Sequence, residues 1–478
     1  MAKVQTLSGS KRARVMSMLS QDLHPLENLP LDILQNVLCF LPIKEATQKC
    51  LIASRFRKSC HFNRKFMFGR DFATHYNRDY IAELVDHLFN THKGDEIQSF
   101  QLHIDPVGLE NLLNKWLYIC AGKRIQDLEL YFLQPGYTLA TDFVNQLKHL
   151  CTLKLVHCEF QLPVLNLQSM VNLRTLVLWH VQFNEDKLDA LIRHCRTLGT
   201  IDLLYCTGLR RVEINARDRR HLKVFRIAGC TDLELLIVDS PTLRSVYYSG
   251  QITKIRFLQP TQLTEAFFNF EPAGNRKYLQ ASDVEKLVVD IPNVTVLTAS
   301  ALIPEALTAK FRHGVFGEAC YDFLNLKELQ LMMDGALFCN PYDVVMLMKH
   351  CPLLEKLFID MNDYHFECGS YWELHQRPRL DKLDHYFDQL KFIKLRGFKF
   401  LQSELQLAKI LLKKATHLEA LILVTPRNGR TKLYRADAPK YSQLFLSWKA
   451  SPDARIVLFE HLNDKSRIRP SHTKHWYC

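Results

Sequence analysis

Long apolar runs are missing from this sequence of 478 residues. No stretch of about 18 consecutive apolar residues occurs, so we expect no membrane-spanning helix and no membrane partner. Residues 1–22 also lack the apolar core of a signal peptide. We therefore expect the chain to act in the nucleus or the cytoplasm, with its 14 cysteines mostly as reduced thiols rather than in a disulfide framework.

Motifs that carry known catalytic chemistry are absent as well. The sequence contains no phosphate-binding loop, no HExxH, no GxSxG and no dinucleotide-binding fingerprint. His149, Cys151, His157 and Cys158 lie close together, but the first two flank the apolar Leu150, so they do not suggest a metal site. We predict no catalytic residue, no cofactor site and no metal site, and hence a protein that is not an enzyme.

Strong charge runs are also few, although the formal net charge is +12. The sequence has no zinc-finger spacing, no RNA-binding sheet motif and no long basic tract, so it does not favour a nucleic-acid partner. The same charge would suit an acidic protein partner, or serve only solubility. Lys11, Arg12 and Arg14 make the first 22 residues basic, and we expect a solvated tail or a weak nuclear-import signal there.

A compact apolar pattern is present at residues 26–57, with the sequence LENLPLDILQNVLCFLPIKEATQKCLIASRFR. Over Ile33–Leu41 its apolar residues recur at i, i+1, i+4, i+5 and i+8, which predicts one stripe of a helix. Pro30 suits the first turn of that helix, and Pro42 ends it. A second amphipathic segment follows at 44–56. Two or three such helices cannot bury a sufficient core alone, so we expect a partner surface to cover them.

This segment resembles the F-box, the motif that docks on the Skp-type adaptor of cullin-based ubiquitin ligases. Its Leu-Pro, Ile-Leu, Val-Leu, Phe-Leu-Pro and Lys-Glu-Ala elements stand where plant members of the family have them. One departure is Phe56, where the family usually has tryptophan. The resemblance implies an adaptor-binding surface made of nine residues: Leu29, Pro30, Ile33, Leu34, Leu38, Leu41, Pro42, Leu51 and Phe56. The alternative is an ordinary helical hairpin in an N-terminal domain.

The phrase L-x-x-L-x-L recurs along the rest of the chain, with neighbouring copies starting about 21 to 25 residues apart in its first half. Copies begin at Ile125, Leu150, Leu173, Leu198, Leu222, Leu243, Leu326, Leu354, Leu390 and Leu418. Because alternate residues of a short strand point to the same side, the leucines of all copies would form one stacked core. Cys158, Cys206 and Cys230 end three copies, and they would fill the turn as small buried groups.

The segments between these copies are of two kinds. Amphipathic phrases with basic residues in the last turn predict helices at 186–198, 344–354 and 407–418. Shorter phrases at 209–216 and 233–241 end at polar or proline signals, and we interpret them as extended segments or tight turns. Residues 260–325 are the least regular, and 287–300 is a candidate for one degenerate repeat. We therefore expect an irregular array.

An F-box-like segment followed by such repeats resembles the plant F-box/leucine-rich-repeat family. The resemblance implies an α/β fold: an N-terminal helical F-box, then an irregular leucine-rich-repeat solenoid with a curved parallel β-sheet on its concave side and helices and extended segments on its convex side. The expected domains are a disordered basic tail at 1–22, the F-box at 23–70, a helical linker or N-terminal cap at 71–124, the solenoid at 125–430, and a C-terminal cap or tail at 431–478.

Side chains between the core leucines should line the concave face of the sheet. Nine of them are candidates for binding a target: Val177, Trp179, Asp202, Leu204, Arg226, Tyr247, Phe358, Lys394 and Arg396. Among these, Val177, Trp179 and Leu204 would form an apolar patch, and Trp, Tyr and Arg are typical interface anchors. The alternative is that loops, or a C-terminal segment that folds back, cover these residues.

The resemblance implies a substrate-recognition subunit of a cullin-type ubiquitin ligase. The F-box would bind the Skp-type adaptor, and through it a cullin and a RING protein, while the repeats hold a target protein for ubiquitination. No cofactor is expected. Two alternatives stay open: a receptor of the same ligase class that needs a small molecule in its concave face, and a scaffold that binds the adaptor without promoting degradation.

Overall fold

The computed structural model describes residues 33, 61–160, 168–218, 220–273, 278–312, 322–334, 338–362, 364–427 and 441–472. The chain divides into two compact units, Met1–Leu198 and Gly199–Cys478. Of the nine predicted adaptor-binding residues, only Ile33 is among the described residues, where it is helical and 44% exposed. The helical F-box and the domain boundaries therefore stay predictions.

The N-terminal unit contains a parallel sheet in the order β1 (Lys65–Phe68), β2 (Ser99–Ile104), β3 (Asp127–Phe132), β5 (Thr152–Val156) and β7 (Thr175–Trp179). Its helices are α6 (Arg70–His75), α7 (Arg78–Thr91), α8 (Glu110–Gly122), α9 (Thr141–Val144) and α10 (Glu185–His194). The short strands β4 (Tyr137–Thr138) and β6 (Cys158–Glu159) form a separate parallel pair. Strands β1 and β2 precede the predicted start of the repeats at residue 125.

Trp116 of α8 is fully buried in the N-terminal unit. Its indole Nε1 donates a hydrogen bond to Asp86 Oδ1 of α7 at 3.0 Å, and Lys115 Nζ binds the same oxygen at 2.8 Å. Burial alone would raise the pKa of Asp86, but these donors, with Lys115 first, lower it below its ordinary value. The aromatic ring and one shared carboxylate thus fix α7 against α8.

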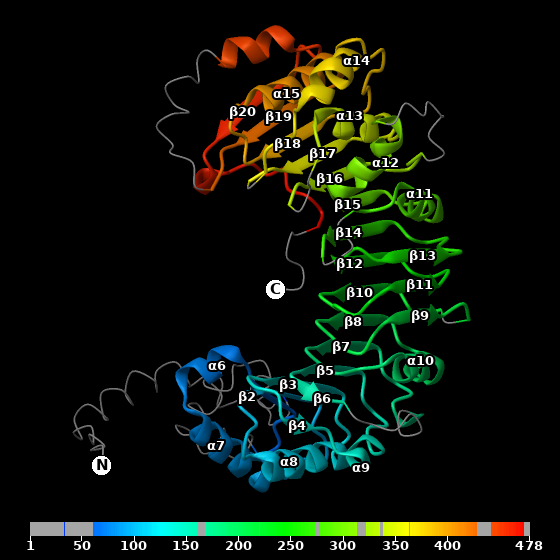
Figure 1. Ribbon diagram of the computed structural model, residues 1–478. Helices are drawn as coiled ribbons and strands as arrows, with labels where there is room; N and C mark the ends of the chain where they lie inside the picture. Colours follow the sequence, from blue (N-terminus) through cyan, green and yellow to red (C-terminus); the bar gives the residue numbers. More distant parts are fainter. Residues whose placement is uncertain are drawn as a thin grey trace, which may run out of the picture. The chain divides into compact units, whose positions relative to one another are not determined.

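The C-terminal unit contains a longer parallel sheet (Figure 1). Its order is β8 (Thr200–Leu204), β10 (Val224–Ala228), β12 (Ser245–Gln251), β14 (Glu265–Glu271), β15 (Val296–Ser300), β16 (Glu328–Met332), β17 (Lys356–Asp360), β18 (Phe392–Arg396), β19 (Ala420–Val424) and β20 (Arg455–Phe459). Every neighbouring pair is in parallel register, so equivalent positions of successive repeats lie side by side.

The chain returns between these strands in two ways. From β8 to β14 the strands start 20 to 24 residues apart, and the returning segments are strands that form a second parallel sheet: β9 (Arg211–Asn215), β11 (Leu235–Asp239) and β13 (Lys254–Leu258). From β14 to β20 the strands start 28 to 36 residues apart, and most returns contain helices.

These helices are α11 (Ala281–Asp290), α12 (Leu302–Arg312), α13 (Pro341–Lys349), the π-helix η2 (Trp372–Gln376), α14 (Arg377–Asp381), α15 (Gln402–Lys414) and residues 441–448. A helix rises about 1.5 Å per residue and a strand about 3.3 Å, so a helical return needs about twice as many residues to cover the same length. This difference in rise explains the two repeat lengths.

The leucine pattern predicted the core correctly. Both inward-pointing residues of β16, β17, β18 and β19 are buried, and so is the leucine that precedes each of these strands. The residues that end three copies, Cys158, Cys206 and Cys230, are also buried. Cys206 Sγ and Cys230 Sγ lie 3.7 Å from the carbonyl oxygens of Leu204 and Ala228, so these thiols close the turns as weak donors.

The predicted helices are present as α10, α13 and α15. Asn340 caps α13 by accepting from the backbone N–H groups of Tyr342 and Asp343, at 2.9 and 3.4 Å, and Asp343 accepts from the Asn340 N–H. Within the part of the chain that the structure describes, no helix combines the length and the apolar character needed to cross a bilayer. The predicted α/β class, with a large parallel sheet, helices and extended returns, is confirmed.

A candidate protein-binding face

Alternate side chains of each strand point away from the leucine core, and we call this side of the sheet the non-core face. In the C-terminal unit the middle position of each strand lies beside the middle position of the next. This middle row contains Asp202, Arg226, Tyr247, Phe267, Thr298, Gln330, Phe358, Lys394, Ile422 and Val457. The structure therefore brings five of the nine candidate residues into one row.

The row begins with a charged pair and an aromatic ring. Arg226 Nη1 lies 3.1 Å from Asp202 Oδ2, and the Arg226 guanidinium lies 5.1 Å from the centroid of the Tyr247 ring. Tyr247 is half-buried, and burial, with the nearby Glu265 and Asp202, raises the pKa of its hydroxyl, which stays neutral at physiological pH. Three strands thus present a cation between a carboxylate and an aromatic face.

Lys394 lies further along the same row and is almost completely buried. Its Nζ donates to Asp464 Oδ2 at 2.6 Å, to Ser466 Oγ at 2.7 Å and to the carbonyl oxygen of Ile468 at 3.3 Å. An ammonium group has three N–H donors, so these three acceptors satisfy it. All three belong to a part of the chain that comes 70 to 74 residues later.

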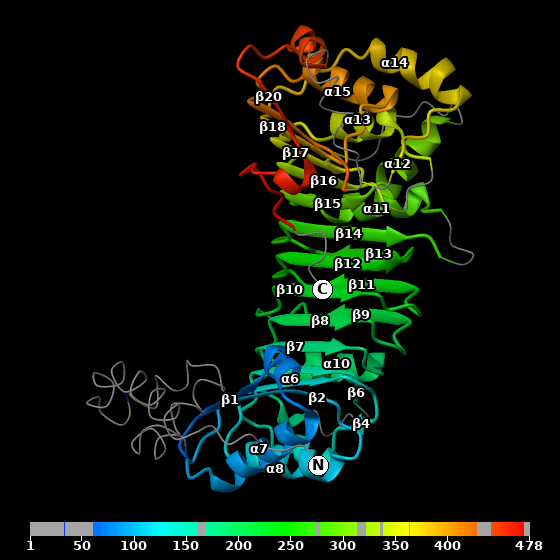
Figure 2. The ribbon, with the colours of Figure 1, turned by 90° about the vertical axis from the view of Figure 1, so that its left-hand side faces the viewer.

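That part, residues 460–472, is the C-terminal segment. In Figure 1 the helices α11, α12, α13 and α15 cover one side of the C-terminal sheet, and the segment, drawn in red, lies on the opposite side. Figure 2 looks onto this side and shows the segment in front of the strands. It contains one short 3-10 turn, η3 (His461–Asn463), and no regular structure from residue 464 to 472.

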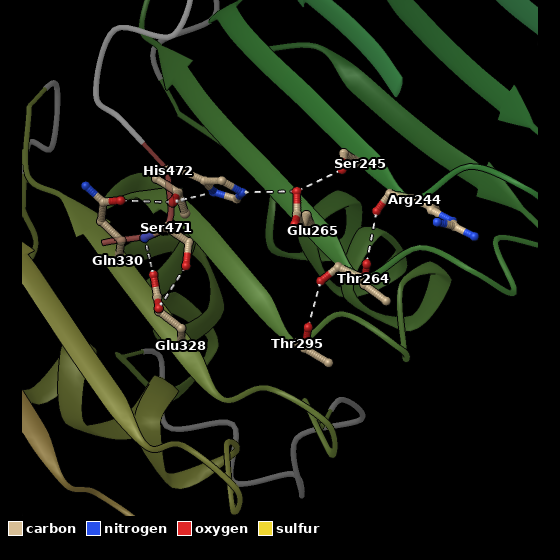
Figure 3. Close-up of polar contacts among 10 residues, drawn as sticks. Arg244, Ser245, Thr264, Glu265, Thr295, Glu328, Gln330, Ser471 and His472 are labelled. Carbon is tan, nitrogen blue, oxygen red and sulfur yellow. Dashed lines mark hydrogen bonds and ion pairs between the residues drawn. The ribbon is translucent and has the colours of Figure 1, made fainter. Parts of the chain in front are cut away.

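A second contact of the segment lies two strands before Lys394. The backbone N–H of Ser471 donates to Glu328 Oε1 at 2.5 Å, and Ser471 Oγ donates to Glu328 Oε2 at 3.0 Å (Figure 3). Glu328 is buried on β16, and Lys356 Nζ lies 3.5 Å from its Oε2. One carboxylate therefore receives two donors from a single residue of the segment.

His472 makes the third contact, over strands β15, β14 and β12. Its Nδ1 lies 2.9 Å from Thr298 Oγ1, and its ring lies 5.1 Å from the ring of Tyr247 and 6.1 Å from that of Phe267. Glu265 Oε2 lies 4.0 Å from Nε2 (Figure 3). Burial lowers the pKa of His472, and the carboxylates of Glu265 and Glu328 oppose this only in part, so the ring is neutral at physiological pH.

The C-terminal segment shows a two-residue alternation. Residues 464, 466, 468 and 470 are partly buried and His472 is fully buried, whereas the cationic residues 465, 467 and 469 are exposed. This period is that of an extended chain with one side against a surface. Burial alone would raise the pKa of Asp464, but hydrogen bonds from Lys394 and Ser466 lower it below its ordinary value.

Other candidate residues are placed as follows. Phe358 is buried in the middle row, and Arg396 Nη1 lies 3.8 Å from Asp360 Oδ2 on the neighbouring strand. Leu204 is buried rather than exposed. The contacts of Lys394 show that a C-terminal segment folds back over this residue, which was the alternative. The expectation of an exposed Leu204 is wrong, because its side chain is buried at the end of β8.

Val177 and Trp179 belong to the N-terminal unit, where both are half-buried on β7. Trp179 Nε1 has no hydrogen-bond partner among the described residues. On the neighbouring strand, Lys154 Nζ forms an ion pair with Glu129 Oε1 at 2.8 Å. Binding of a target by any of the nine candidates stays a prediction.

Several residues of this face were not found from the sequence. Phe267 was missed because β14 has Ala266 where other copies have a larger apolar residue, so the repeat phrase is broken there. Thr298 lies in the degenerate repeat at 287–300. The alternation of Asp464 to His472 is visible in the sequence only as cationic residues at 465, 467 and 469, and nothing in it tells which surface the residues between them contact.

One cavity of about 420 Å³ lies elsewhere in the C-terminal unit, beside β11 and the start of α11. Charged side chains line much of it, including Arg211, Glu234, Lys254 and Asp283, and none of its lining residues belongs to the middle row. Among the described residues, no three His, Cys, Asp or Glu side chains come together as a metal site would require.

Comparisons with known proteins agree with the repeats. A family model described as the At1g61320/AtMIF1 leucine-rich-repeat domain matches residues 88–446. The FBD-associated F-box protein At1g61320 of Arabidopsis thaliana is 26% identical over 441 residues, which cover 90% of this chain and 96% of that protein. The Arabidopsis thaliana F-box/FBD/LRR-repeat protein At1g13570 is 20% identical over 450 residues, 91% of this chain and 98% of that one.

Among solved structures, that of the Leptospira interrogans LRR protein LIC12759 matches with a TM-score of 0.35 and 15% identity, over 78% of this chain and 85% of that chain.

Proposed function

Because the chain belongs to the plant F-box/leucine-rich-repeat family represented by At1g61320/AtMIF1, we propose that it is the substrate-recognition subunit of a cullin-type ubiquitin ligase. Residues 26–57 would dock on a Skp-type adaptor, and through it on a cullin and a RING protein. The repeats would hold the target. We also propose that the protein acts in the nucleus or the cytoplasm.

The observation that carries this proposal is the order of two features in one chain. An apolar helical pattern too short to bury itself precedes a sheet whose non-core face carries charged and aromatic side chains. The first feature needs a protein partner for stability, and the second offers anchors of the kind found in protein interfaces.

Catalysis in this proposal is a matter of proximity. A receptor that holds a target near a ubiquitin-charged enzyme raises the local concentration of target lysines, so the receptor itself needs no nucleophile and no acid–base pair. The cysteines Cys120, Cys158 and Cys351 fit this role, because burial raises the pKa of each thiol and keeps it unreactive.

Adaptor docking is tested by titrating the full chain with a purified Skp-type adaptor. The double variant Leu29→Ala/Pro30→Ala should weaken binding by about 30-fold or more, because interface anchors contribute roughly 2 kcal/mol each. Leu374→Ala, at an exposed leucine of η2, is the matched control and should bind like the wild type. Equal adaptor binding by all three proteins would reject the docking site.

The target role is tested by affinity purification with the proteasome blocked. Proteins retained by the Leu29→Ala/Pro30→Ala variant are target candidates, and proteins lost belong to the ligase. Reconstituted ubiquitination of a retained candidate is the expected result. If no retained protein is ubiquitinated by the reconstituted complex, the chain is a scaffold rather than a ligase receptor.

A further inference from the structure

The C-terminal segment crosses the strands in an extended path rather than adding a strand to the sheet. Asp464 and His472 are eight residues apart, and their contacts lie on β18 and β14, which are four strand positions apart. Four strand spacings amount to about 19 Å, and eight extended residues reach about 26 to 29 Å. A nearly extended chain therefore covers this distance without strain.

Side chains make most of these contacts, and they do so at separate points. Lys394 donates to the carboxylate of Asp464 and the hydroxyl of Ser466. Glu328 accepts from the N–H and the hydroxyl of Ser471. The ring of His472 contacts the rings of Tyr247 and Phe267. The intervening residues 465, 467 and 469 face solvent. The face thus makes contacts that are specific to one extended sequence pattern.

The contacts of the C-terminal segment would allow another peptide to replace it on the non-core face. Leu462 is 92% exposed, and Ile468 and Pro470 are only partly buried, so the segment is held mainly by polar contacts. The segment itself supplies the acceptors that surround Lys394 Nζ. When the segment leaves, water can hydrate the ammonium group, which avoids the penalty of an unpaired buried charge.

We propose that the non-core face of the C-terminal unit is a peptide-binding groove, and that residues 464–472 occupy it as an intramolecular ligand that a target displaces. The target offers an extended segment with an acidic residue, a hydroxyl residue two positions later, and a serine followed by a ring five to six positions after that. This inference rests on the proposed function for its target, but the groove itself requires no adaptor.

Tethering explains why such a groove stays closed in the free protein. A segment attached to the chain that it binds has an effective concentration in the millimolar range for a short flexible connection. A free peptide of the same sequence must compete with that concentration, so the intact chain should bind it poorly. Weakening the tethered copy, without changing the groove, should open the site.

The test measures binding of a fluorescein-labelled synthetic peptide, with the sequence of residues 460–472, to three forms of the full chain by fluorescence anisotropy. The first is the wild type, and the second is a released variant, Asp464→Ala/Ser471→Ala/His472→Ala. The third adds Lys394→Met to the released variant. Lys382→Met, at an exposed lysine, replaces Lys394→Met in a matched control.

The released variant should bind the peptide at least tenfold more tightly than the wild type. Adding Lys394→Met should weaken peptide binding by the released variant at least tenfold, whereas adding Lys382→Met should leave the affinity unchanged. A labelled peptide with Asp464→Lys and Ser471→Ala should bind none of the proteins. Circular-dichroism spectra that match the wild type at the assay temperature exclude unfolding as the cause.

The proposal is overturned if the released variant binds the peptide no better than the wild type, or if Lys394→Met has no more effect than Lys382→Met. Because the assay contains no adaptor, its outcome is independent of the docking titration. Peptide binding without adaptor binding would keep the groove and reject the ligase role, and adaptor binding without peptide binding would do the reverse.

Discussion

A lysine on the non-core face differs in exposure and in its partner between the two units. Lys154 in the N-terminal unit and Lys394 in the C-terminal unit both stand between the last two apolar residues of a repeat phrase. The Lys154 side chain is 31% exposed and pairs with Glu129 on the neighbouring strand. The Lys394 side chain is 5% exposed and pairs with Asp464 of the C-terminal segment.

This difference separates two levels of information in a repeat protein. The leucines determine where the strands lie and which side chains leave the core, because their spacing fits the pleat. They do not determine what covers the other face. In the C-terminal unit a distant segment supplies that cover, and in the N-terminal unit the ion pair of Lys154 on β5 lies within the sheet.

The cores of the two units should respond alike, which gives the largest expected effect. Leu155→Ala and Leu395→Ala each remove a fully buried leucine from the equivalent position of a repeat. Each should destabilise its own unit by about 2 to 5 kcal/mol through lost burial and a residual cavity. Hydrogen exchange followed by mass spectrometry, read separately in β5 and β18 peptides, measures both.

If Leu395→Ala proved several times more costly than Leu155→Ala, the covering segment would be coupled to the core, and the separation of core from face would fail.

The two lysines should differ, and this is the next largest effect. Lys394→Ala removes the ammonium group that holds the C-terminal segment through three hydrogen bonds, and it should cost about 1.5 to 3 kcal/mol, the usual contribution of a hydrogen bond to a charged group. Lys154→Ala breaks a partly exposed pair and should cost at most about 1 kcal/mol. Exchange protection of β17–β19 and β3–β7 peptides reports the two values. Equal losses at both lysines would contradict the contrast between the faces.

The sequence predicted the strands better than their surroundings. The repeat phrase identified ten strands whose three key positions all hold a large apolar residue, since such side chains at a fixed spacing leave few alternatives. Strands β14 and β15 were harder to find, because Ala266 and Ala299 satisfy the tight core there without giving a strong apolar signal. Strand β20 was assigned to a cap or tail from the sequence, although Ile456 and Leu458 stand in register with Leu421 and Leu423 of β19.

The sequence predicted where the candidate residues lie in the sheet, but not which other residues surround them. Register follows from the repeat phrase, so Asp202, Arg226, Tyr247 and Lys394 were correctly placed in one row. Burial of Lys394 depends on contacts with residues 70 to 74 positions away, which no local pattern encodes. The sequence therefore allowed a C-terminal segment that folds back over this face only as an alternative.

The two units should also respond to pH with opposite signs. In the N-terminal unit, His92 accepts a hydrogen bond from Lys123 Nζ at its Nδ1, at 2.9 Å, and donates from Nε2 to the Asn63 carbonyl oxygen at 2.9 Å. Burial first, then the charge of Lys123, lowers the pKa of His92 from 6.5 to about 4.

The folded N-terminal unit therefore binds fewer protons than the unfolded chain between pH 6.5 and 4. Its stability should fall by about 2 kcal/mol between pH 7 and pH 5, because each pKa unit corresponds to about 1.4 kcal/mol and most of that interval lies between the two pKa values. His92→Gln, whose amide can keep one donor and one acceptor, should remove most of this dependence. Exchange rates of β1 and β2 peptides at pH 7 and pH 5 measure it, and an unchanged dependence in His92→Gln would contradict the assignment.

In the C-terminal unit, Glu404 should give an effect of the opposite sign. Burial raises its pKa from 4.5 to about 7, although its Oε2 accepts from the backbone N–H groups of Lys399 at 2.6 Å and Leu401 at 3.3 Å. The folded unit then binds more protons than the unfolded chain between pH 4.5 and 7, so its stability should decrease as the pH rises through that window.

Glu404→Gln keeps an acceptor for both N–H groups and never ionises, so it should abolish this decrease, which we expect to be about 2 to 3 kcal/mol between pH 5 and pH 8. Exchange of α15 and β18 peptides between pH 5 and pH 8 provides the measurement, with Gln402→Ala as a control on the exposed start of the same helix. Should the wild-type C-terminal unit instead lose stability on acidification, as the N-terminal unit does, the Glu404 carboxylate must be ionised at neutral pH. The backbone donors would then outweigh burial, and the two units would share one pH response despite their different faces.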